Sequence, residues 1–508
     1  MDQTRDALCN DIEHRLGRIA CDAILDGRQF THLGHLLDFC KKEKSIIYGS
    51  FIISILQIVA INFFHSGFEQ LAYVMSVVSA IHLLVLIFLH IFYLQVIVLL
   101  KNIGDFLGLF RAIPESKKPL EDGKLKILIF NWRDTKHVWA GGAETYMHEI
   151  AKRWVAEGNQ VTLFCGNDTY QKRHEVIDGV RVVRRGGTYT VYIWGALYYL
   201  LRFRDAFDVV VDSENGLPFF TPLYIRKPIF LLIHHVHQEV FRDNLVFPLS
   251  TIAMFIEKQV MPRVYRNIKV ITVSESSKKD IIKLGCSKKN EIKVVSPGVN
   301  LSSYKKMHKY TNPTFIYLGR LKRYKNVDVA IKAFAIVVKE VSNAVLYIAG
   351  EGDTGSELKK LVKELQIEKN VVFTNKVTEE QKVRLLARSW VAVQPSSFEG
   401  WGITVIEANA CGTPVIASKT NGLLDSVVDG ETGRLVPVKN VEVLAETMIE
   451  VISSKQLLRK YSQNAYRWSK LFDWNKNAEA FYSHMRKEVS TLTSEETDIQ
   501  NISTVSNT

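Results

Sequence analysis

Several residue patterns are scarce or missing in this chain, and each absence excludes a class of protein. Proline (12 residues) and glycine (29) are too few among 508 residues for a collagen-like or low-complexity chain. Hydrophobic residues, at 47%, are too many for a disordered one. The six cysteines show no CxxC or CxxH spacing, which argues against a zinc site or a disulfide framework and favours a reducing compartment. The sequence therefore predicts a globular protein, of two or three domains at this length.

Acidic residues are also fewer than basic ones. Asp and Glu number 53 against 65 Lys and Arg, which leaves a net charge of +12. Such a balance favours an anionic partner: a nucleic acid, a phosphorylated substrate or a lipid surface. The basic residues are not interleaved with aromatic ones in the way that builds a nucleic-acid platform, so we predict no nucleic-acid partner.

Charged residues are absent from two long stretches near the N-terminus. Residues 45–64 and 71–100 contain no Asp, Glu, Lys or Arg, and each is long enough to span a bilayer. Helices of a soluble core normally keep one charged face. Lys and Arg flank the outer ends of both stretches, which places these ends in the cytoplasm. The sequence predicts a transmembrane helical hairpin over 45–101, preceded by a cytoplasmic helical segment at 1–44.

The rest of the chain alternates short apolar runs with longer amphipathic stretches, which is typical of βα units around parallel sheets. Two series of runs predict two such domains, 124–300 and 301–472, with a hinge at SPGVN (296–300). The predicted strands are 126–130, 161–165, 208–212, 229–233 and 270–273, then 314–319, 344–350, 371–374, 390–396 and 414–418. The other expected segments are a linker (102–123), a helix (473–488) and a disordered tail (489–508).

Ligands of such sheets bind at the carboxyl ends of the strands, so the loops there carry the candidate site. WAGGAET (139–145) lies between a predicted strand and a helix, and Gly141 and Gly142 would let the backbone approach a phosphate. The loop has neither the GxGxxG pattern nor a Walker lysine, so we predict no dinucleotide fingerprint and no P-loop. A simple tight turn is the alternative.

A second loop, IHHVHQE (233–239), contains three histidines. No regular element places His234, His235 and His237 on one face, and no HExxH pattern is present, so we predict no metal site. We expect instead that a histidine at the strand end enters the cleft and hydrogen-bonds a reacting sugar or phosphate.

Two further loops supply charge. In GRLKRYK (319–325), Arg320 and Lys325 would direct two cations into one anion pocket, unless the loop is merely a solvated basic surface. In the segment 396–418, Glu399 and Glu407 flank the start of a helix at Gly400 and Gly402. The N-terminus of that helix can bind a diphosphate and its carboxylate can accept hydrogen bonds from ribose. A pair of surface glutamates is the alternative.

Together these motifs resemble, in order, the retaining GT-B glycosyltransferases of family 4, which include mannosyl-, glucosyl- and N-acetylglucosaminyltransferases. The resemblance covers 124–488. Its most specific element is the Glu-x7-Glu pair in EGWGITVIEANACGTPVIAS, to which GGAE, VSESS, GRLKRYKN, AGEGD and DGETGRLVP add. It implies an α/β GT-B fold: two doubly wound Rossmann-like domains facing a cleft, the first for the acceptor and the second for the nucleotide-sugar donor. The helix 473–488 would return to the first domain.

The resemblance also implies a hexosyl transfer from a nucleotide diphospho-sugar, with retention of configuration and without a catalytic metal or other cofactor. Arg320 and Lys325 would hold the donor pyrophosphate and Glu407 the ribose. Glu399 would lie beside the transferred sugar, and His234 at the donor sugar near the reacting centre. The glycines at 141, 142, 400 and 402 would give the donor close access to the backbone.

The predicted anchor favours a polyprenyl-phosphate-linked or glycolipid acceptor, reached at the cytoplasmic face of the cell membrane. Two alternatives remain open: a nucleotide-sugar epimerase of the same fold, and a membrane-tethered protein that binds nucleotide sugar or glycan without catalysis. The chain also departs from the family pattern. Asn375 stands where glycine is frequent, and we expect the turn to persist because asparagine tolerates the left-handed conformation.

Overall fold

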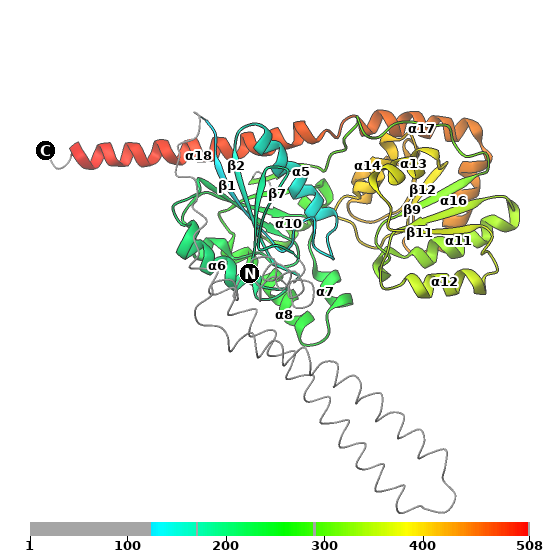
Figure 1. Ribbon diagram of the computed structural model, residues 1–508, viewed down its shortest axis with the longest axis horizontal. Coiled ribbons are helices and arrows are strands. Elements are labelled where there is room, and N and C mark those ends of the chain that lie inside the picture. Colours follow the sequence, from blue (N-terminus) through cyan, green and yellow to red (C-terminus); the bar gives the residue numbers. More distant parts are fainter. Residues whose placement is uncertain (1–122, 169–170, 288–290, 506–508) are drawn as a thin grey trace, which may run out of the picture. The chain divides into compact units, whose positions relative to one another are not determined.

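The computed structural model describes residues 123–168, 171–287 and 291–505 (Figure 1). The predicted segment 1–44 and hairpin 45–101 lie outside these residues. Among the residues that are described, no helix is both long and apolar enough to cross a bilayer. The described chain forms two α/β lobes, each built on a mainly parallel sheet, which confirms the predicted pair of Rossmann-like sheets.

The first lobe contains an eight-stranded sheet in the order β3-β4-β2-β1-β5-β6-β7-β8. Its strands are β1 (Lys126–Asn131), β2 (Gln160–Cys165), β3 (His174–Ile177), β4 (Val180–Arg184), β5 (Val209–Glu214), β6 (Ile229–Ile233), β7 (Lys269–Thr272) and β8 (Ile292–Val294). The pair β3–β4 is antiparallel, while β1, β2, β5, β6, β7 and β8 pair in parallel. The sequence predicted the buried, β-branched strands of this sheet. It missed β3 and β8, which are short and partly exposed, and β4, which is buried but contains two arginines (VRVVR).

Helices connect these strands. They are α5 (Gly142–Ala156), α6 (Val191–Tyr198), α7 (Gln238–Asn244), α8 (Leu249–Phe255), α9 (Met261–Val264) and α10 (Glu275–Leu284), with single turns η1 (Tyr199–Phe203), η2 (Thr221–Leu223) and η3 (Ile256–Val260). The start of α10 shows how the sequence sets a boundary. Ser274 caps it by accepting a hydrogen bond from the Ser277 N–H, and Gly285 ends it in the left-handed conformation.

The second lobe contains a six-stranded parallel sheet in the order β11-β10-β9-β12-β13-β14. Its strands are β9 (Thr314–Leu318), β10 (Val345–Ala349), β11 (Val371–Asn375), β12 (Val391–Gln394), β13 (Val415–Ser418) and β14 (Gly433–Val436). All of them except β14 were predicted. Asn375, at the end of β11, has a φ of 56°, so the expected left-handed turn is present.

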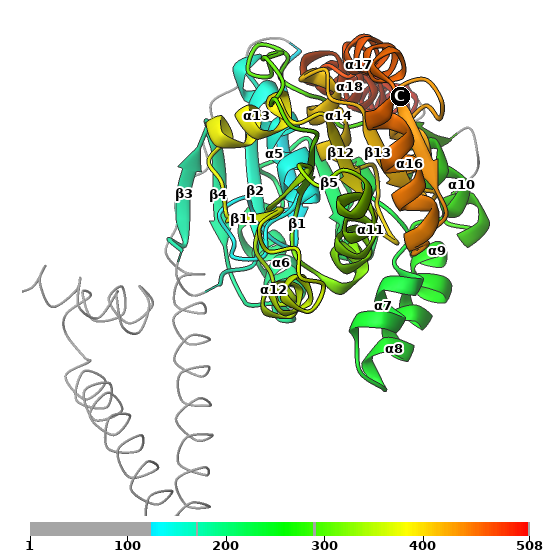
Figure 2. The ribbon, with the colours of Figure 1, turned by 90° about the vertical axis from the view of Figure 1, so that its right-hand side faces the viewer.

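Both faces of the second sheet are covered. The helices are α11 (Val327–Glu340), α12 (Gly355–Glu364), α13 (Glu379–Arg388), α14 (Ile403–Ala410), α15 (Leu423–Ser426), α16 (Val441–Ser453) and α17 (Lys455–Ser469), with the single turn η5 (Arg323–Lys325). Along β9, Phe315 and Tyr317 pack with α11, α12 and α16, whereas Ile316 packs with α13 and α14. This alternation is what a strand buried on both faces requires, and Figure 2 shows α11 beside α16.

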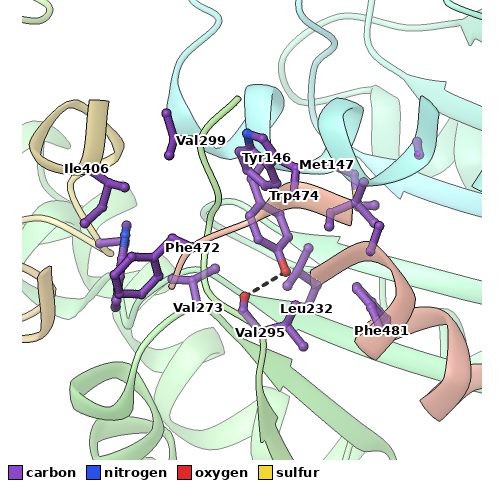
Figure 3. Close-up of a cluster of buried hydrophobic side chains, with 14 of the residues drawn as sticks. Tyr146, Met147, Leu232, Val273, Val295, Val299, Ile406, Phe472, Trp474 and Phe481 are labelled. Carbon is purple, nitrogen blue, oxygen red and sulfur yellow. Dashed lines mark hydrogen bonds between the residues drawn. The ribbon is translucent and has the colours of Figure 1, made fainter. Parts of the chain in front are cut away.

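The last helix, α18 (Trp474–Val505), packs on the first lobe. The indole of Trp154 in α5 donates to the Ala478 carbonyl at 3.0 Å, and its ring meets Phe481 edge-on. Figure 3 shows Trp474 beside Tyr146, whose hydroxyl donates to the Val295 carbonyl at 2.9 Å. The structure differs from the sequence prediction at the C-terminus, because the helix continues where a disordered tail was expected from 489. No glycine or proline lies between Trp474 and Val505 to end it.

The chain passes between the lobes twice, and the two crossings lie side by side. The Val299 N–H donates to the Phe472 carbonyl at 3.0 Å, and a Cβ at Gly298 would come within 2.5 Å of the Trp474 nitrogen. Elsewhere, α10 and α15 meet through polar groups. Ser276 bonds to the Asp425 carboxylate and also accepts from the Gly422 N–H at 2.9 Å.

Candidate active site

The glycine loop that precedes α5 lies next to the predicted anion pocket. A Cβ at Gly141 would be 3.4 Å from the guanidinium carbon of Arg320, and one at Gly142 would touch Ile403 at the start of α14. The Arg320 guanidinium donates to the Trp139 carbonyl at 3.3 Å. The structure thus brings together Gly141, Gly142 and Arg320, which are about 180 residues apart in sequence.

A buried carboxylate fixes this loop. Glu144, in the first turn of α5, accepts from the Gly141 N–H at 2.6 Å through one oxygen. Its other oxygen accepts from Arg133 Nε at 3.0 Å and Asn215 Nδ2 at 2.6 Å. The sequence prediction did not assign Glu144 a role, although the GGAE motif contains it. Its three donors make it a positioning residue for the loop.

The two predicted cations come from one loop after β9. Arg320 is partly exposed and donates to the Tyr324 hydroxyl at 3.1 Å. The backbone after β10 lies close to this loop: a Cβ at Gly350 would be 1.9 Å from the Gly319 carbonyl oxygen, so only glycine fits at position 350. The ammonium of Lys325 is 2.5 Å from Glu399 Oε1, which also accepts from Ser396 Oγ at 2.9 Å. Lys325 and Glu399 are mostly buried, with 12% and 13% of their side chains exposed, so solvent screens this pair weakly.

Glu407 has a different set of partners. Its Oε1 accepts from the Tyr304 hydroxyl at 2.6 Å and from Lys382 Nζ at 2.8 Å. Burial acts to lower the pKa of Lys382, but Glu407 and Glu379 outweigh it and raise that pKa, so Lys382 is a cation at neutral pH. Sequence reasoning missed Tyr304 and Lys382. They are 103 and 25 residues from Glu407 and belong to no motif with it.

The N-terminus of α14 lies in the same region. Gly402 precedes the helix with a φ of 86°, a left-handed conformation that favours glycine. A Cβ at Gly400 would be 2.9 Å from the His234 carbonyl oxygen, so this loop closely approaches the histidine loop of the first lobe. The free N–H groups at such a helix start favour an anion.

The three histidines occupy different environments. The His234 ring is buried and meets Tyr146 edge-on at 5.4 Å, and burial together with the nearby His237 lowers its pKa to about 3. The His235 ring lies 4.0 Å from that of His237 and is the partly exposed one of the three. Burial and the neighbouring cations His237 and Lys325 hold the pKa of His235 well below its usual value. The predicted role of His234 at the donor sugar stays a prediction. His234 meets Gly400 through its backbone carbonyl, whereas the ring of His235 would come within 3.6 Å of a Cβ at Gly400 through Nδ1.

His237 belongs to a buried charged cluster. Its Nδ1 is 3.1 Å from Glu214 Oε1 and 3.7 Å from Glu257 Oε1, and Glu257 also accepts from the His237 backbone N–H at 2.5 Å. Burial lowers the pKa of His237, but the two carboxylates raise it more, to about 10. In the described part of the chain, this is the one group of at least three ligating side chains close enough to hold a metal ion. The charge of His237 already offsets one of the two carboxylates.

Comparison with known proteins matches these features over most of the described chain. The family model "Glycosyltransferase Family 4" matches residues 140–303, and the model "Glycosyl transferases group 1" matches 302–468. An uncharacterised glycosyltransferase of Methanocaldococcus jannaschii is 30% identical over 357 residues, which are 65% of this chain and 89% of that protein. The MMP alpha-(1->4)-mannosyltransferase of Mycolicibacterium hassiacum is 31% identical over 301 residues, or 53% of this chain and 68% of that one.

A solved structure shares the fold. The Anabaena protein HepE, in complex with UDP and glucose, superposes with a TM-score of 0.56 at 18% identity, covering 72% of this chain and all of that one.

Proposed function

Since the chain belongs to the group 1 glycosyltransferases of family 4, and is thus a retaining, nucleotide-sugar-dependent hexosyltransferase of GT-B fold, we propose that it glycosylates a lipid-linked acceptor at the cytoplasmic face of a membrane. The sugar is of the mannose, glucose or N-acetylglucosamine type. The donor is a nucleotide diphospho-sugar, and UDP-sugars are the first candidates because HepE, which shares the fold, binds UDP. Support for a lipid-linked acceptor comes from the uncharged stretches 45–64 and 71–100.

One observation carries the proposed chemistry: Arg320 and the N-terminus of α14 both lie beside the Gly141–Gly142 backbone. Lys325, from the same loop as Arg320, pairs with Glu399 just before that helix. Breaking the bond between the anomeric carbon and the diphosphate leaves negative charge on the phosphate oxygens. Fixed cations and N–H groups stabilise that charge without reorganising. The ion pair with Glu399 holds the Lys325 ammonium in position for the donor diphosphate. In this arrangement Glu399 lies beside the transferred sugar.

The remaining steps need no additional protein nucleophile. The acceptor hydroxyl attacks the anomeric carbon on the face that the diphosphate leaves, its oxygen forms the new glycosidic bond, and its proton passes to the departing phosphate oxygen. The products are the glycosylated lipid and a nucleoside diphosphate. No metal is needed in this scheme, since the two cations and the helix start neutralise the leaving group.

We expect membranes that contain the protein to release nucleoside diphosphate from one donor in a panel of UDP- and GDP-sugars, and to transfer its labelled sugar to the lipid extract. Membranes with Arg320→Ala serve as the control and should do neither. An epimerase would interconvert the donor without acceptor-dependent release, and a binding protein would release nothing. Label found in soluble glycan alone would refute the lipid acceptor and leave the transferase intact.

Lys382→Met is expected to weaken binding of the nucleoside diphosphate by about tenfold, since a hydrogen bond to a charged group contributes about 1.5–3 kcal/mol. Without this ammonium, Glu407 keeps only Tyr304 to orient it toward the ribose. Calorimetric titration measures the effect. Lys332→Met is the matched control, because Lys332 pairs with Asp328 on the exposed surface of α11. Equal affinities in the two variants would show that Lys382 does not position Glu407.

A further inference from the structure

The segment that follows the histidine loop carries an unusual concentration of exposed apolar side chains. Five large ones lie within ten residues, with exposed fractions between 47% and 82%: Val246, Phe247, Leu249, Ile252 and Phe255. We call these five residues the α8 face. Ser250 and Ala253, on the other side of the helix, are buried against the lobe. Exposed apolar surface on this scale marks a contact with a partner or a membrane.

Charged residues around the α8 face are mostly basic. From Gln238 to Arg266 the exposed charged side chains are Glu239, Arg242, Asp243, Lys258, Arg263 and Arg266, two acidic and four basic. Apolar residues with aromatic tips, flanked by Arg and Lys, form the pattern of an element lying in the headgroup region of an anionic bilayer. The two uncharged stretches at 45–64 and 71–100 of the same chain point to the same occupant.

The α8 face is tied to the candidate active site. Gln238, the first residue of α7, donates through its side chain to the Met254 carbonyl at 3.1 Å and to Glu257 Oε2 at 2.6 Å. Glu257 in turn accepts from the His237 N–H. Figure 2 shows α7 and α8 side by side at one end of the first lobe. A bilayer in contact with α8 would therefore lie at a fixed position relative to the histidine loop.

We propose that the α8 face rests in the headgroup–acyl boundary of an anionic bilayer and so holds the histidine loop at the membrane surface, where a lipid-linked acceptor emerges. This inference rests on the proposed function, from which it takes the membrane. Beyond that function, it identifies which surface of the first lobe contacts the lipid. Neither a second copy of the chain nor a soluble protein partner needs the basic flank.

Depth-dependent fluorescence quenching tests the inference on the full chain. Cys9, Cys21 and Cys40 are first replaced by serine, because Cys165, Cys286 and Cys411 are buried. A polarity-sensitive fluorophore is then attached at Phe255→Cys or, as the control, at Leu471→Cys. The two sites are similarly exposed, at 60% and 64%, and Leu471 lies just beyond α17. The proteins are mixed with vesicles of neutral and anionic phospholipid that carry a nitroxide quencher near the headgroup.

We expect flotation of both labelled proteins with the vesicles, at least twofold quenching at position 255, and quenching below a tenth at position 471. Flotation with equal quenching at both sites, or with none at 255, would overturn the α8 face and leave the membrane location standing. Failure of every variant, and of the parent, to float would overturn both proposals. A blue shift at 255 that depends on protein concentration without vesicles would assign the face to chain–chain contact instead.

Discussion

Arg320→Ala is expected to lower turnover about 100- to 1000-fold, the range seen when one preorganised donor to a developing charge is removed. It should also weaken nucleoside diphosphate binding by about one to two decades. The reason is the position of Arg320, which lies against the Gly141 backbone and is held there by the Trp139 carbonyl and the Tyr324 hydroxyl. Steady-state kinetics with the donor and calorimetry with the diphosphate measure the two effects.

Two variants make this prediction specific. Arg320→Lys keeps the charge but loses the planar pair of donors, so it should recover only part of the affinity. Lys322→Ala removes a cation from the same loop that pairs with Asp353 on the exposed surface, and it should bind the diphosphate as the parent does. An Arg320→Ala protein with unchanged diphosphate affinity would show that the pyrophosphate lies elsewhere.

Lys325 calls for a different design, because its removal also leaves Glu399 without its partner cation. Lys325→Ala should therefore weaken diphosphate binding by more than the loss of one attraction would, since the unpaired carboxylate of Glu399 repels the diphosphate. The double variant with Glu399→Gln would recover that excess and separate the two contributions.

The second large effect is expected on stability. Glu257→Gln should lower the free energy of unfolding by about 1.5–3 kcal/mol, because the buried carboxylate accepts from the His237 N–H and from Gln238 Nε2, and a hydrogen bond to a charged group contributes about that much. For a lobe of this size that corresponds to a fall in Tm of roughly 3–12 °C. Thermal and urea unfolding followed by circular dichroism give both quantities. Glu450→Gln is the control, since its pair with Arg434 is exposed and should contribute no more than about 1 kcal/mol.

The same cluster gives stability a pH dependence of defined sign. The folded-state pKa of His237 is raised from 6.5 to about 10, so its contribution is complete below pH 6.5 and is lost as pH rises toward 10. Unfolding midpoints at pH 6.5, 8 and 9.5 should decline more steeply in the parent than in Glu257→Gln. Parallel curves for the two proteins would exclude His237 as the titrating group.

Much of the fold was accessible from sequence, because strands buried on both faces show as unbroken apolar runs. The same reasoning failed where burial is partial, as in β3, or where a helix has no natural end, as in α18 beyond residue 488. The polar, Ser/Thr-rich composition of 489–508 predicted disorder, although this segment contains no glycine or proline to end the helix. Local pattern carries no information about whether such a segment continues a helix already packed on a lobe.

The candidate site divides along a similar line. Arg320, Lys325, Glu399 and the glycines could be proposed from sequence because each lies in a loop just after a strand, where chain order already indicates position. Lys382 and Tyr304 were not found, because they reach Glu407 only through tertiary packing. The histidines could not be told apart for a related reason. His234, His235 and His237 lie in one loop, and only the fold decides that His237 faces two carboxylates while His234 faces Tyr146.

The paired crossings between the lobes limit how the protein can move. The backbone at Val299 is hydrogen-bonded to the backbone at Phe472, so the two connecting segments move together. The close approach of Gly298 to Trp474 leaves no room for one segment to shift along the other. A rotation of the lobes about an axis through this point is the motion that the paired crossings oppose least. Such a rotation would separate the polar contacts of Ser276 with Asp425 and Gly422, which water can replace at little cost. It would also move Arg320 away from the Trp139 carbonyl and the Gly141 backbone. Opening by such a rotation belongs to the microsecond-to-millisecond range, fast enough to release the spent nucleotide between turnovers.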